Sequence, residues 1–272
     1  MASSSDPGLH KDAVRGFVPP QNDEEKRLVR RAEELCQTAL SRGIPRYTGF
    51  LSDREQSLAQ AGVNRANGTF ARFWGGYSQA ERKILSLEPP DTWQEEPIAI
   101  LRLHAQAAGG TPPTHRDYLG ALLGLGLERA CLGDLIITQT PGVAYAFVLA
   151  DKVDFITMNL CSAGRCTVRA EQCDTLPPDA VQAMTYPMQQ ATVPSLRADV
   201  VLAAMMHTSR TLAAQAIQAG RVEINHMALH AGHEAVFAKD IVTVRGTGRY
   251  RLAEIGGKSK KDRIFIIFYQ YE

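Results

Sequence analysis

The sequence predicts an α+β protein in which helical segments and antiparallel strands follow one another in separate modules. Three observations support this prediction. Apolar residues recur every three or four positions after Asn22, as on one face of an amphipathic helix. Residues 98–170 follow the order strand, helix, strand, strand, helix, strand. After Ser195, two short helical patterns precede segments in which apolar and polar residues alternate.

The first module, residues 22–90, is predicted to be mainly helical. It follows residues 1–21, which are rich in Ser, Pro and Gly and are expected to form an unstructured lead-in. A helix begins after Asn22, where three acidic residues occupy the first turn and interact favourably with the helix dipole. This helix is predicted to end at Gly43, just before a proline.

Two shorter helices are predicted in the same module from capping sequences. Ser52–Glu55 and Ser78–Glu81 both place a glutamate three residues after a serine, which is the spacing of a capping box. Between them, Phe70–Trp74 is predicted to form a strand, because the loop signal Gly75-Gly76 follows it.

Residues 96–175 are predicted to form a ferredoxin-like module with βαββαβ order. Its second and third strands are joined through Pro141-Gly142, which is a hairpin signal. A linker that contains several Pro and Gln residues is expected over residues 176–194. The predicted strands are 98–104, 135–138, 144–149 and 165–170, and the predicted helices are 115–127 and 151–162.

Charge is distributed unevenly along the chain, although the formal net charge is only +1. Residues 1–194 contain 19 Lys and Arg against 22 Asp and Glu, a net charge of −3. Residues 195–272 contain 11 against 7, a net charge of +4, and seven of these basic residues lie from Arg245 to Arg263. The near-neutral total therefore does not exclude a nucleic-acid partner for the C-terminal segment.

Other features argue against membrane and secreted classes of protein. The longest unbroken apolar run, Val143–Ala150, has eight residues, which is too few to cross a bilayer. The N-terminal residues lack the apolar stretch of a secretory signal. Five cysteines without zinc-type pairing favour free thiols in a reducing compartment. We therefore expect a cytoplasmic protein without a membrane partner.

Metal, cofactor and catalytic sites are disfavoured by residue spacing. The histidines His226, His230 and His233 have neither the spacing of a helical zinc pair nor a carboxylate or cysteine that completes a set. His115 and Asp117 are interpreted as the polar first turn of a helix rather than as an acid–base pair. No P-loop or nucleophile elbow occurs, so we expect no metal, no cofactor and no catalytic residue.

The segment after Ser195 is the most specific part of the sequence. A break at His207-Thr208 separates two helical patterns, and Ser209 or Thr208 is placed to cap the second helix. Gly220 is a natural residue to end that helix in the left-handed conformation. Two short helices on a small sheet should leave three arginines near one edge, namely Arg197, Arg210 and Arg221.

This segment resembles the S4 RNA-binding domain over residues 195–244. The resemblance rests on an Arg-x-Asp-x-x-Leu opening at Arg197, a Ser-Arg-x-x-Ala core at Ser209 and an Ile-x-x-Gly-x-Val-x-Ile-Asn exit. Two positions depart from the S4 pattern, which usually has glycine where His226 and Lys239 stand. Both departures concern the shape of a turn.

The wider chain, over residues 24–271, is similar to YlmH-type S4 proteins. The motifs Trp74–Arg82, Thr114–Gly120 and Leu132–Asp134 carry this wider resemblance. Proteins of this family are associated with the large ribosomal subunit, and some act in quality control on stalled subunits that carry peptidyl-tRNA. The resemblance implies a non-enzymatic protein that binds rRNA, tRNA or both on the large subunit and that is monomeric when free.

The same resemblance, together with charge, implies which residues contact RNA. Arginine suits such contacts, because its planar group can hold two phosphate oxygens and can stack on a base. The arginines near Gly246 and Gly248 are expected to lie on a flexible turn, and the nearby lysines to add salt-sensitive attraction. The predicted contacts are Arg197, Ser209, Arg210, Arg221 and Asn225 from the motif, and Arg245, Arg249, Arg251, Lys258, Lys260 and Lys261 from the C-terminal extension.

Two alternative functions use the same features. An RNA-modifying enzyme would use the C-terminal domain as an RNA anchor, but the glycine-rich loop of a methyltransferase is missing. Residues 98–175 are also too few for the catalytic domain of a pseudouridine synthase. A protein of the division machinery, which family gene context suggests, would be expected to show a coiled coil or a membrane-targeting helix. Neither pattern occurs, so non-enzymatic RNA binding is the preferred hypothesis.

Overall fold

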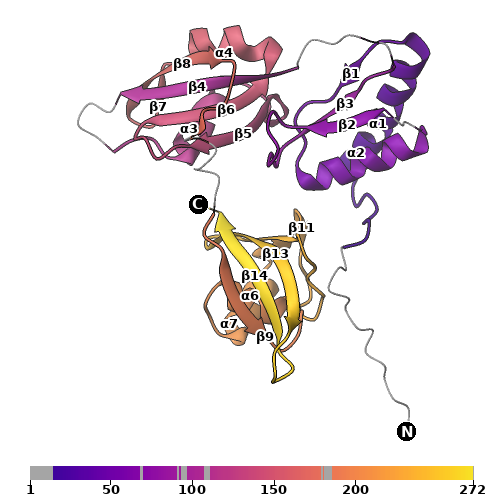
Figure 1. Ribbon diagram of the computed structural model, residues 1–272, viewed down its shortest axis with the longest axis vertical. Helices are drawn as coiled ribbons and strands as arrows, with labels where there is room; N and C mark the ends of the chain where they lie inside the picture. Colours follow the sequence, from indigo (N-terminus) through magenta and orange to yellow (C-terminus); the bar gives the residue numbers. More distant parts are fainter. Residues whose placement is uncertain are drawn as a thin grey trace. The chain divides into compact units, whose positions relative to one another are not determined.

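The computed structural model describes residues 15–67, 70–90, 92, 97–106, 111–178, 180 and 186–271 of the 272-residue chain. The chain divides into two compact units (Figure 1). The body comprises Pro19–Thr185, and the C-terminal unit comprises Tyr186–Glu272 together with the N-terminal residues up to Val18. Both units contain helices and antiparallel sheets, so the predicted α+β class is confirmed.

The N-terminal part of the body combines two helices with a small sheet. Helices α1 (Asp23–Arg42) and α2 (Asp53–Arg65) pack on the three-stranded sheet β1-β3-β2 through a core that includes Leu35, Val63 and Leu85. Both helices begin where the sequence predicts, and so does β2 within one residue. The strands are β1 (Arg46–Tyr47), β2 (Ala71–Trp74) and β3 (Ile84–Leu87).

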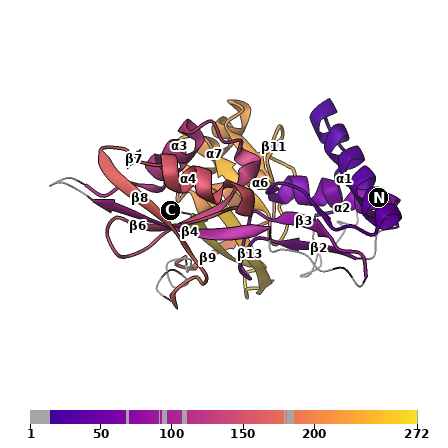
Figure 2. The same cartoon turned by 90° about the horizontal axis from the view of Figure 1, so that it is seen from above.

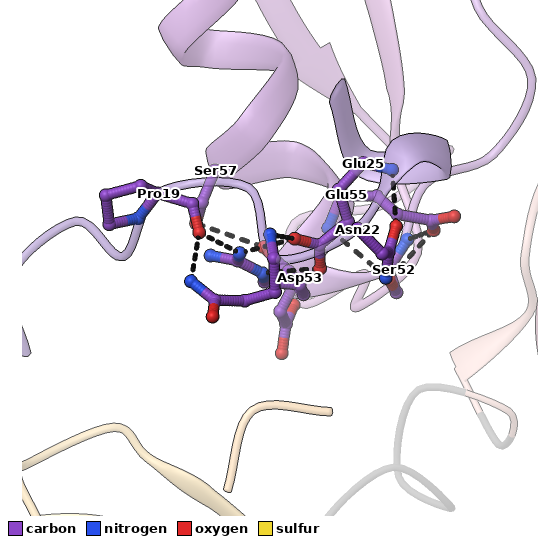
Figure 3. A network of polar contacts seen from close by, with 9 residues as sticks. Pro19, Asn22, Glu25, Ser52, Asp53, Glu55 and Ser57 are labelled. Carbon is purple, nitrogen blue, oxygen red and sulfur yellow. Dashed lines mark hydrogen bonds and ion pairs between the residues drawn. The ribbon is translucent and has the colours of Figure 1, made fainter. Parts of the chain in front are cut away.

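Local side-chain bonds determine where α1 and α2 begin (Figure 3). The Asn22 side chain accepts a hydrogen bond from the Glu25 N–H, and Ser52 and Glu55 form a capping box at the start of α2. The Arg54 guanidinium donates to the Glu25 carboxylate at 2.7 and 3.0 Å. These bonds hold the pKa of Glu25 below its usual value and join the starts of the two helices.

The predicted helix at Ser78–Glu81 is not formed, and this prediction is wrong. The segment is a turn that leads into β3. The Glu81 N–H, which would donate to a capping serine, donates instead to the Asp134 carboxylate at 2.7 Å. The spacing matches a capping box, but a partner 53 residues away takes the hydrogen bond.

The rest of the body is built on a five-stranded antiparallel sheet with the order β5-β6-β4-β8-β7. The chain order β4, α3, β5, β6, α4, β8 gives the predicted ferredoxin-like arrangement, with the short β7 added at one edge. Helices α3 (His115–Gly124) and α4 (Val153–Asn159) cover one face of this sheet (Figure 2). The remaining elements are β4 (Ile98–Gln106), η1 (Arg129–Cys131), β5 (Leu132–Ile137), β6 (Val143–Leu149), η2 (Ala150–Lys152), β7 (Ser162–Ala163) and β8 (Cys166–Cys173).

Both faces of the five-stranded sheet contribute to the core of the body. Leu101 on one face packs with Tyr118 of α3 and with α4. On the other face, Phe147 belongs to a cluster with Phe50 and Ile84 from the N-terminal part. The five-stranded sheet is therefore the middle layer of the body. Helices α3 and α4 pack on one of its faces, and the N-terminal part of the body packs on the other.

The C-terminal unit contains a six-stranded antiparallel sheet with the order β11-β10-β12-β13-β14-β9. Helices α6 (Ala198–Met205) and α7 (Arg210–Gln218) pack with the sheet in a core that includes Val201, Leu252 and Phe268. The strands are β9 (Gln189–Val193), β10 (Val222–Ile224), β11 (Met227–Ala228), β12 (Ile241–Val244), β13 (Gly248–Lys258) and β14 (Ile264–Tyr271).

Strand β9 corrects the linker expected over residues 176–194. Residues 189–193 pair with β14 along its length from Ile264 to Phe268. Val193 lies in the core of the C-terminal unit, whereas the other β9 residues are polar or small, so the strand has little apolar pattern of its own. Residues 179 and 181–185 of the expected linker lie outside the described residues.

The lead-in expected over residues 1–21 is only partly described, because residues 1–14 lie outside the described part. Residues 15–20 form no helix or strand, in agreement with the expectation. The Arg15 guanidinium nevertheless donates to the buried Asp240 carboxylate at 3.0–3.2 Å and lies over the Phe237 ring. This end of the chain is therefore anchored on the C-terminal unit.

The two positions that depart from the S4 pattern both have left-handed backbone. The φ angle is 64° at His226 and 72° at Lys239. This conformation costs an L-residue about 1 kcal/mol or more, whereas glycine adopts it without strain. The turns therefore keep the geometry that glycine favours, although another residue occupies each position.

We expect Lys239→Gly to raise the free energy of unfolding of the C-terminal unit by about 0.5–1 kcal/mol. The relief of backbone strain should exceed the extra chain entropy that glycine has in the unfolded state. Lys239→Ala is the matched control, because it removes the same side chain and charge but keeps Cβ. Urea midpoints followed by circular dichroism compare the variants, and equal midpoints for the two would contradict this explanation.

Candidate nucleic-acid interface

Two of the predicted RNA-binding arginines flank helix α6. Arg197 is the extended residue before α6, and Arg210 is the first residue of α7. Ser209 caps α7, because its Oγ accepts a hydrogen bond from the Leu212 N–H at 3.2 Å. Gly220 follows the end of α7 with a φ of 65°, as the sequence predicts.

A buried aspartate brings these two arginines together. Arg197 donates from Nε and Nη2 to the two carboxylate oxygens of Asp199, at 3.1 and 3.0 Å. Arg210 donates from the same two nitrogens to Oδ2 of Asp199, at 3.0 and 2.8 Å. The Asp199 side chain is only 7% exposed, whereas those of Arg197 and Arg210 are 43% and 59% exposed.

The charge balance at Asp199 keeps its carboxylate ionised. Burial raises the pKa of Asp199, but the hydrogen bonds and charges of Arg197 and Arg210 outweigh burial and hold the pKa below its usual value. Within the described residues, the Nη1 group of each arginine makes no hydrogen bond. Asp199 therefore orients two exposed guanidinium groups and leaves donors of both for a ligand. Sequence reasoning assigned no role to Asp199, although it stands inside the S4 opening motif.

Arg221 and Arg245 are neighbours in the backbone, at the ends of β10 and β12. The Arg245 N–H donates to the Arg221 carbonyl at 2.8 Å, and both side chains are exposed. Glu223 lies 3.9 Å from the Arg245 guanidinium and offsets part of its charge. This pair is a second place where predicted residues come together.

Asn225 has a structural task in the turn between β10 and β11. Its side-chain amide donates to Asp240 at 2.8 Å, and its carbonyl oxygen accepts from the Ile241 N–H at 2.8 Å. Asn225 also has left-handed backbone, with a φ of 50°. These bonds explain an asparagine at this position, and a contact between Asn225 and RNA stays a prediction.

The basic extension is divided between a strand and a hairpin tip. Arg249 and Arg251 were expected on a flexible turn, but both lie in β13. Their neighbours Tyr250 and Leu252 are buried in the core, so alternation places the two arginines on the opposite face of the sheet from α6 and α7. The expectation of a flexible turn is wrong, because the alternating residues 249–252 form part of a strand despite the flanking glycines.

The predicted lysines lie at the tip of the β13–β14 hairpin. Lys258, Lys260 and Lys261 are all exposed, and Lys258 forms an ion pair with Asp262 at 2.8 Å. Of the predicted residues, the structure thus joins Arg197 to Arg210 and Arg221 to Arg245. The predicted residues of β13 and its hairpin tip belong to other parts of the sheet.

Two of the three motifs of the wider family resemblance meet inside the body. Asp134 accepts hydrogen bonds from the Tyr77 hydroxyl at 2.7 Å and from the N–H groups of Glu81 and Arg82 at 2.7 and 3.0 Å. Arg82 also donates from Nε to the Leu132 carbonyl at 3.0 Å. Trp74–Arg82 and Leu132–Asp134 are therefore one structural junction, which joins the two parts of the body.

A second arginine lies next to this junction. Burial, and then the charge of Arg82, lower the pKa of Arg129 to about 10, while Asp134 acts in the opposite direction. Burial and the Arg129 charge also lower the pKa of His115.

In the described part of the chain, no group of three His, Cys, Asp or Glu residues is placed to hold a metal ion. No described helix has the length and apolarity needed to span a membrane.

Exposed arginines that a buried carboxylate orients, on a unit with excess positive charge, are typical of the class of RNA-binding proteins. Comparison with known proteins agrees with this class. A family model described as the putative RNA-binding domain in YlmH matches residues 111–176. The ribosome-associated protein quality control protein P2 of Bacillus subtilis (strain 168) is 32% identical over 247 residues, which cover 90% of this chain and 95% of that protein. The chain belongs to the YlmH family, as its sequence predicts.

The solved structure of cell division protein ylmH from Streptococcus pneumoniae is also similar. It shares 17% identity with this chain at a TM-score of 0.47, and the match covers 58% of this chain and 96% of that one.

The match to the family model, residues 111–176, runs from just before α3 to just after β8 and so lies in the body. The family resemblance implies further RNA contacts by the N-terminal and ferredoxin-like modules, but every residue predicted to contact RNA lies in the C-terminal unit.

Proposed function

We propose that the protein binds rRNA, tRNA or both on the large ribosomal subunit and acts in the quality control of stalled translation. It does so in the cytoplasm, as a monomer when free, and without catalysing a reaction. The pair of arginines on Asp199 carries this proposal, because its geometry suits the phosphates of folded RNA. The name of the B. subtilis relative supports the ribosomal setting.

The chemistry of structured RNA explains why an oriented arginine pair suits this task. An RNA helix has a deep and narrow major groove, so proteins contact mainly its phosphates, its 2′-hydroxyls and its shape. A guanidinium group that is already held in place loses less side-chain entropy when it binds a phosphate. The body carries a small net negative charge over residues 1–194, which should limit indiscriminate adsorption to RNA.

Sedimentation with purified ribosomal subunits tests the proposal directly. The protein should travel with the large subunit and not with the small subunit. With about four phosphate contacts, its affinity should fall by about 100-fold between ~50 and ~200 mM salt. Binding that does not depend on salt, or equal binding to both subunits, would contradict the proposal.

Crosslinking in cells, followed by sequencing of the attached RNA, tests the partner. A dominant site in large-subunit rRNA or in tRNA is expected, and a diffuse profile would count against a specific role. Nucleoside analysis of the same rRNA tests the non-enzymatic part. Stoichiometric modification that depends on the protein would favour an RNA-modifying enzyme instead.

A further inference from the structure

The outer face of the C-terminal sheet carries an apolar and aromatic stripe along β14. Residues Ile266 and Phe268 of this strand are fully buried in the core shared with α6 and α7. The alternate positions therefore lie on the opposite face of the sheet. Phe265 on that face is 44% exposed. The residues of the stripe are Phe265, Ile267, Tyr269 and Tyr271, and Arg263 precedes them at the hairpin tip.

Three tyrosines form a cluster at one end of this stripe. The rings of Tyr186 and Tyr269 are stacked, with centroids 5.1 Å apart and an angle of 4° between their planes. Tyr271 meets both rings edge-on, at 5.1 and 5.2 Å. All three residues are half-buried, and the hydroxyl end of Tyr271 is fully buried. Tyr186 comes from the segment before β9. A stacked pair of rings has two outer faces, on which a further ring or base can stack.

Arginines of the neighbouring strand flank the tyrosines. Arg249 pairs with Tyr271 across the two strands, and its guanidinium carbon lies 4.5 Å from the centre of the Tyr271 ring. Arg251 pairs in the same way with Tyr269. Figure 1 shows β9, β14 and β13 side by side, so the tyrosines of β14 and the arginines of β13 lie on adjacent strands. Glu254, which pairs with Ile267, is the acidic residue nearest to the arginines along β13.

We propose that this outer face, which we call the tyrosine face, is a second RNA-binding surface that stacks one or two unpaired bases. The inference rests on the proposed RNA-binding function, but it concerns the side of the sheet opposite the Arg197–Asp199–Arg210 site. Aromatic rings accept any base by stacking, and arginines beside them pair with the phosphates. The exposed cations of the hairpin tip, Lys258, Lys260 and Arg263, continue the positive charge along the path of a strand.

The division of tasks follows from the two geometries. The Asp199 site presents two oriented guanidinium groups, which suit the backbone of a folded RNA. The tyrosine face presents aromatic surface with arginines at its side, which suits a single-stranded loop or end. RNA that has both a helix and an unpaired segment would engage both surfaces.

The test compares single-stranded and duplex RNA as ligands of the full chain. Fluorescence anisotropy measures binding to a labelled oligouridine of about ten nucleotides and to a blunt-ended duplex of similar length. Tyr269→Ala removes the ring that contacts both other tyrosines. It should weaken oligouridine binding by about 10-fold or more and change duplex binding by less than about threefold. Tyr269→Phe keeps the ring and should bind oligouridine nearly as well as the unaltered protein.

A second variant keeps the test decisive if Tyr269→Ala unfolds. Arg251→Ala leaves all three rings in place and should still weaken oligouridine binding by several-fold, because it removes a cation beside the bases. Two results would overturn the proposal: no oligouridine binding by the unaltered protein, or an equal loss in Tyr269→Phe and Tyr269→Ala. Binding of large subunits is measured separately, so failure of the tyrosine face and failure of the ribosomal function are distinguishable.

Discussion

Replacing Arg197 and Arg210 together by alanine is expected to weaken binding to the large ribosomal subunit by about 100-fold at near-physiological salt. Each exposed guanidinium can give a charge-assisted hydrogen bond to a phosphate, and the loss of one such bond lowers affinity by about 10-fold. Loss of two phosphate contacts should also make the plot of log affinity against log salt shallower by about 1.8. Titration of labelled protein with purified subunits at several salt concentrations measures both quantities.

Two control variants distinguish the effect of this particular site on affinity from the effect of positive charge in general. Arg27→Ala with Arg30→Ala removes two exposed positive charges from α1 in the body and should change affinity only slightly. Arg197→Lys with Arg210→Lys keeps the charge but loses the planar group, so an intermediate loss is expected. An equal loss in the α1 control would mean that net charge, and not this site, determines binding.

Stability must be compared in the same experiment, because Asp199 is buried. In the native protein the two arginines hold its pKa below the usual value. The ion pairs therefore stabilise the fold above the pKa that Asp199 has when unfolded, and this contribution is lost as the pH falls through its lower, folded pKa. Without the arginines, burial alone acts on Asp199 and raises its pKa. Binding is best measured near pH 7, after circular dichroism has shown that the variant is folded.

Features that depend on neighbouring residues were predictable from the sequence. The Asn22 and Ser52 caps, the Ser209 cap and the left-handed Gly220 all use partners within four residues. The βαββαβ order was predictable for a related reason, because each element carries its own periodic pattern and Pro141-Gly142 marks the hairpin. In these cases local chemistry and the tertiary fold favour the same conformation.

Features that depend on distant partners were not predictable in this way. Ser78–Glu81 has the spacing of a capping box, but the Glu81 N–H finds the Asp134 carboxylate instead. Strand β9 forms by pairing with β14, which would otherwise present an unpaired edge. The Gln-rich sequence of β9 alone gives little indication of a strand. The role of Asp199 was not predictable for a similar reason, since only the fold shows that it is buried between two arginines.

The sheet of the C-terminal unit shows where the excess positive charge of the chain lies. Its basic residues occupy both faces and one hairpin tip rather than a single edge. The core face carries helices α6 and α7 with the Asp199 site, and the outer face carries Arg249 and Arg251 beside tyrosines. Under the two proposals, this unit holds RNA from two directions, which one basic edge cannot do.

Asp134→Ala is expected to lower the free energy of unfolding of the body by about 3 kcal/mol. The Asp134 carboxylate accepts three hydrogen bonds, from the Tyr77 hydroxyl and from the N–H groups of Glu81 and Arg82. Its removal takes this acceptor from the three donors and leaves the Arg82 and Arg129 charges close together with one negative charge fewer beside them. The urea midpoint of the body should fall by about 1 M.

Tryptophan fluorescence makes this measurement specific to the body, because both tryptophans of the chain, Trp74 and Trp93, belong to it. Asp151→Ala is the matched control, since Asp151 is an exposed aspartate of the body that pairs only with the adjacent Lys152 in the described structure. Its loss should change the midpoint very little. Under native conditions, Asp134→Ala should keep the RNA affinity of the C-terminal unit. Equal midpoints for the two variants would show that the Tyr77–Arg82–Asp134 junction does not stabilise the body, and the family motifs that form it would then require another explanation.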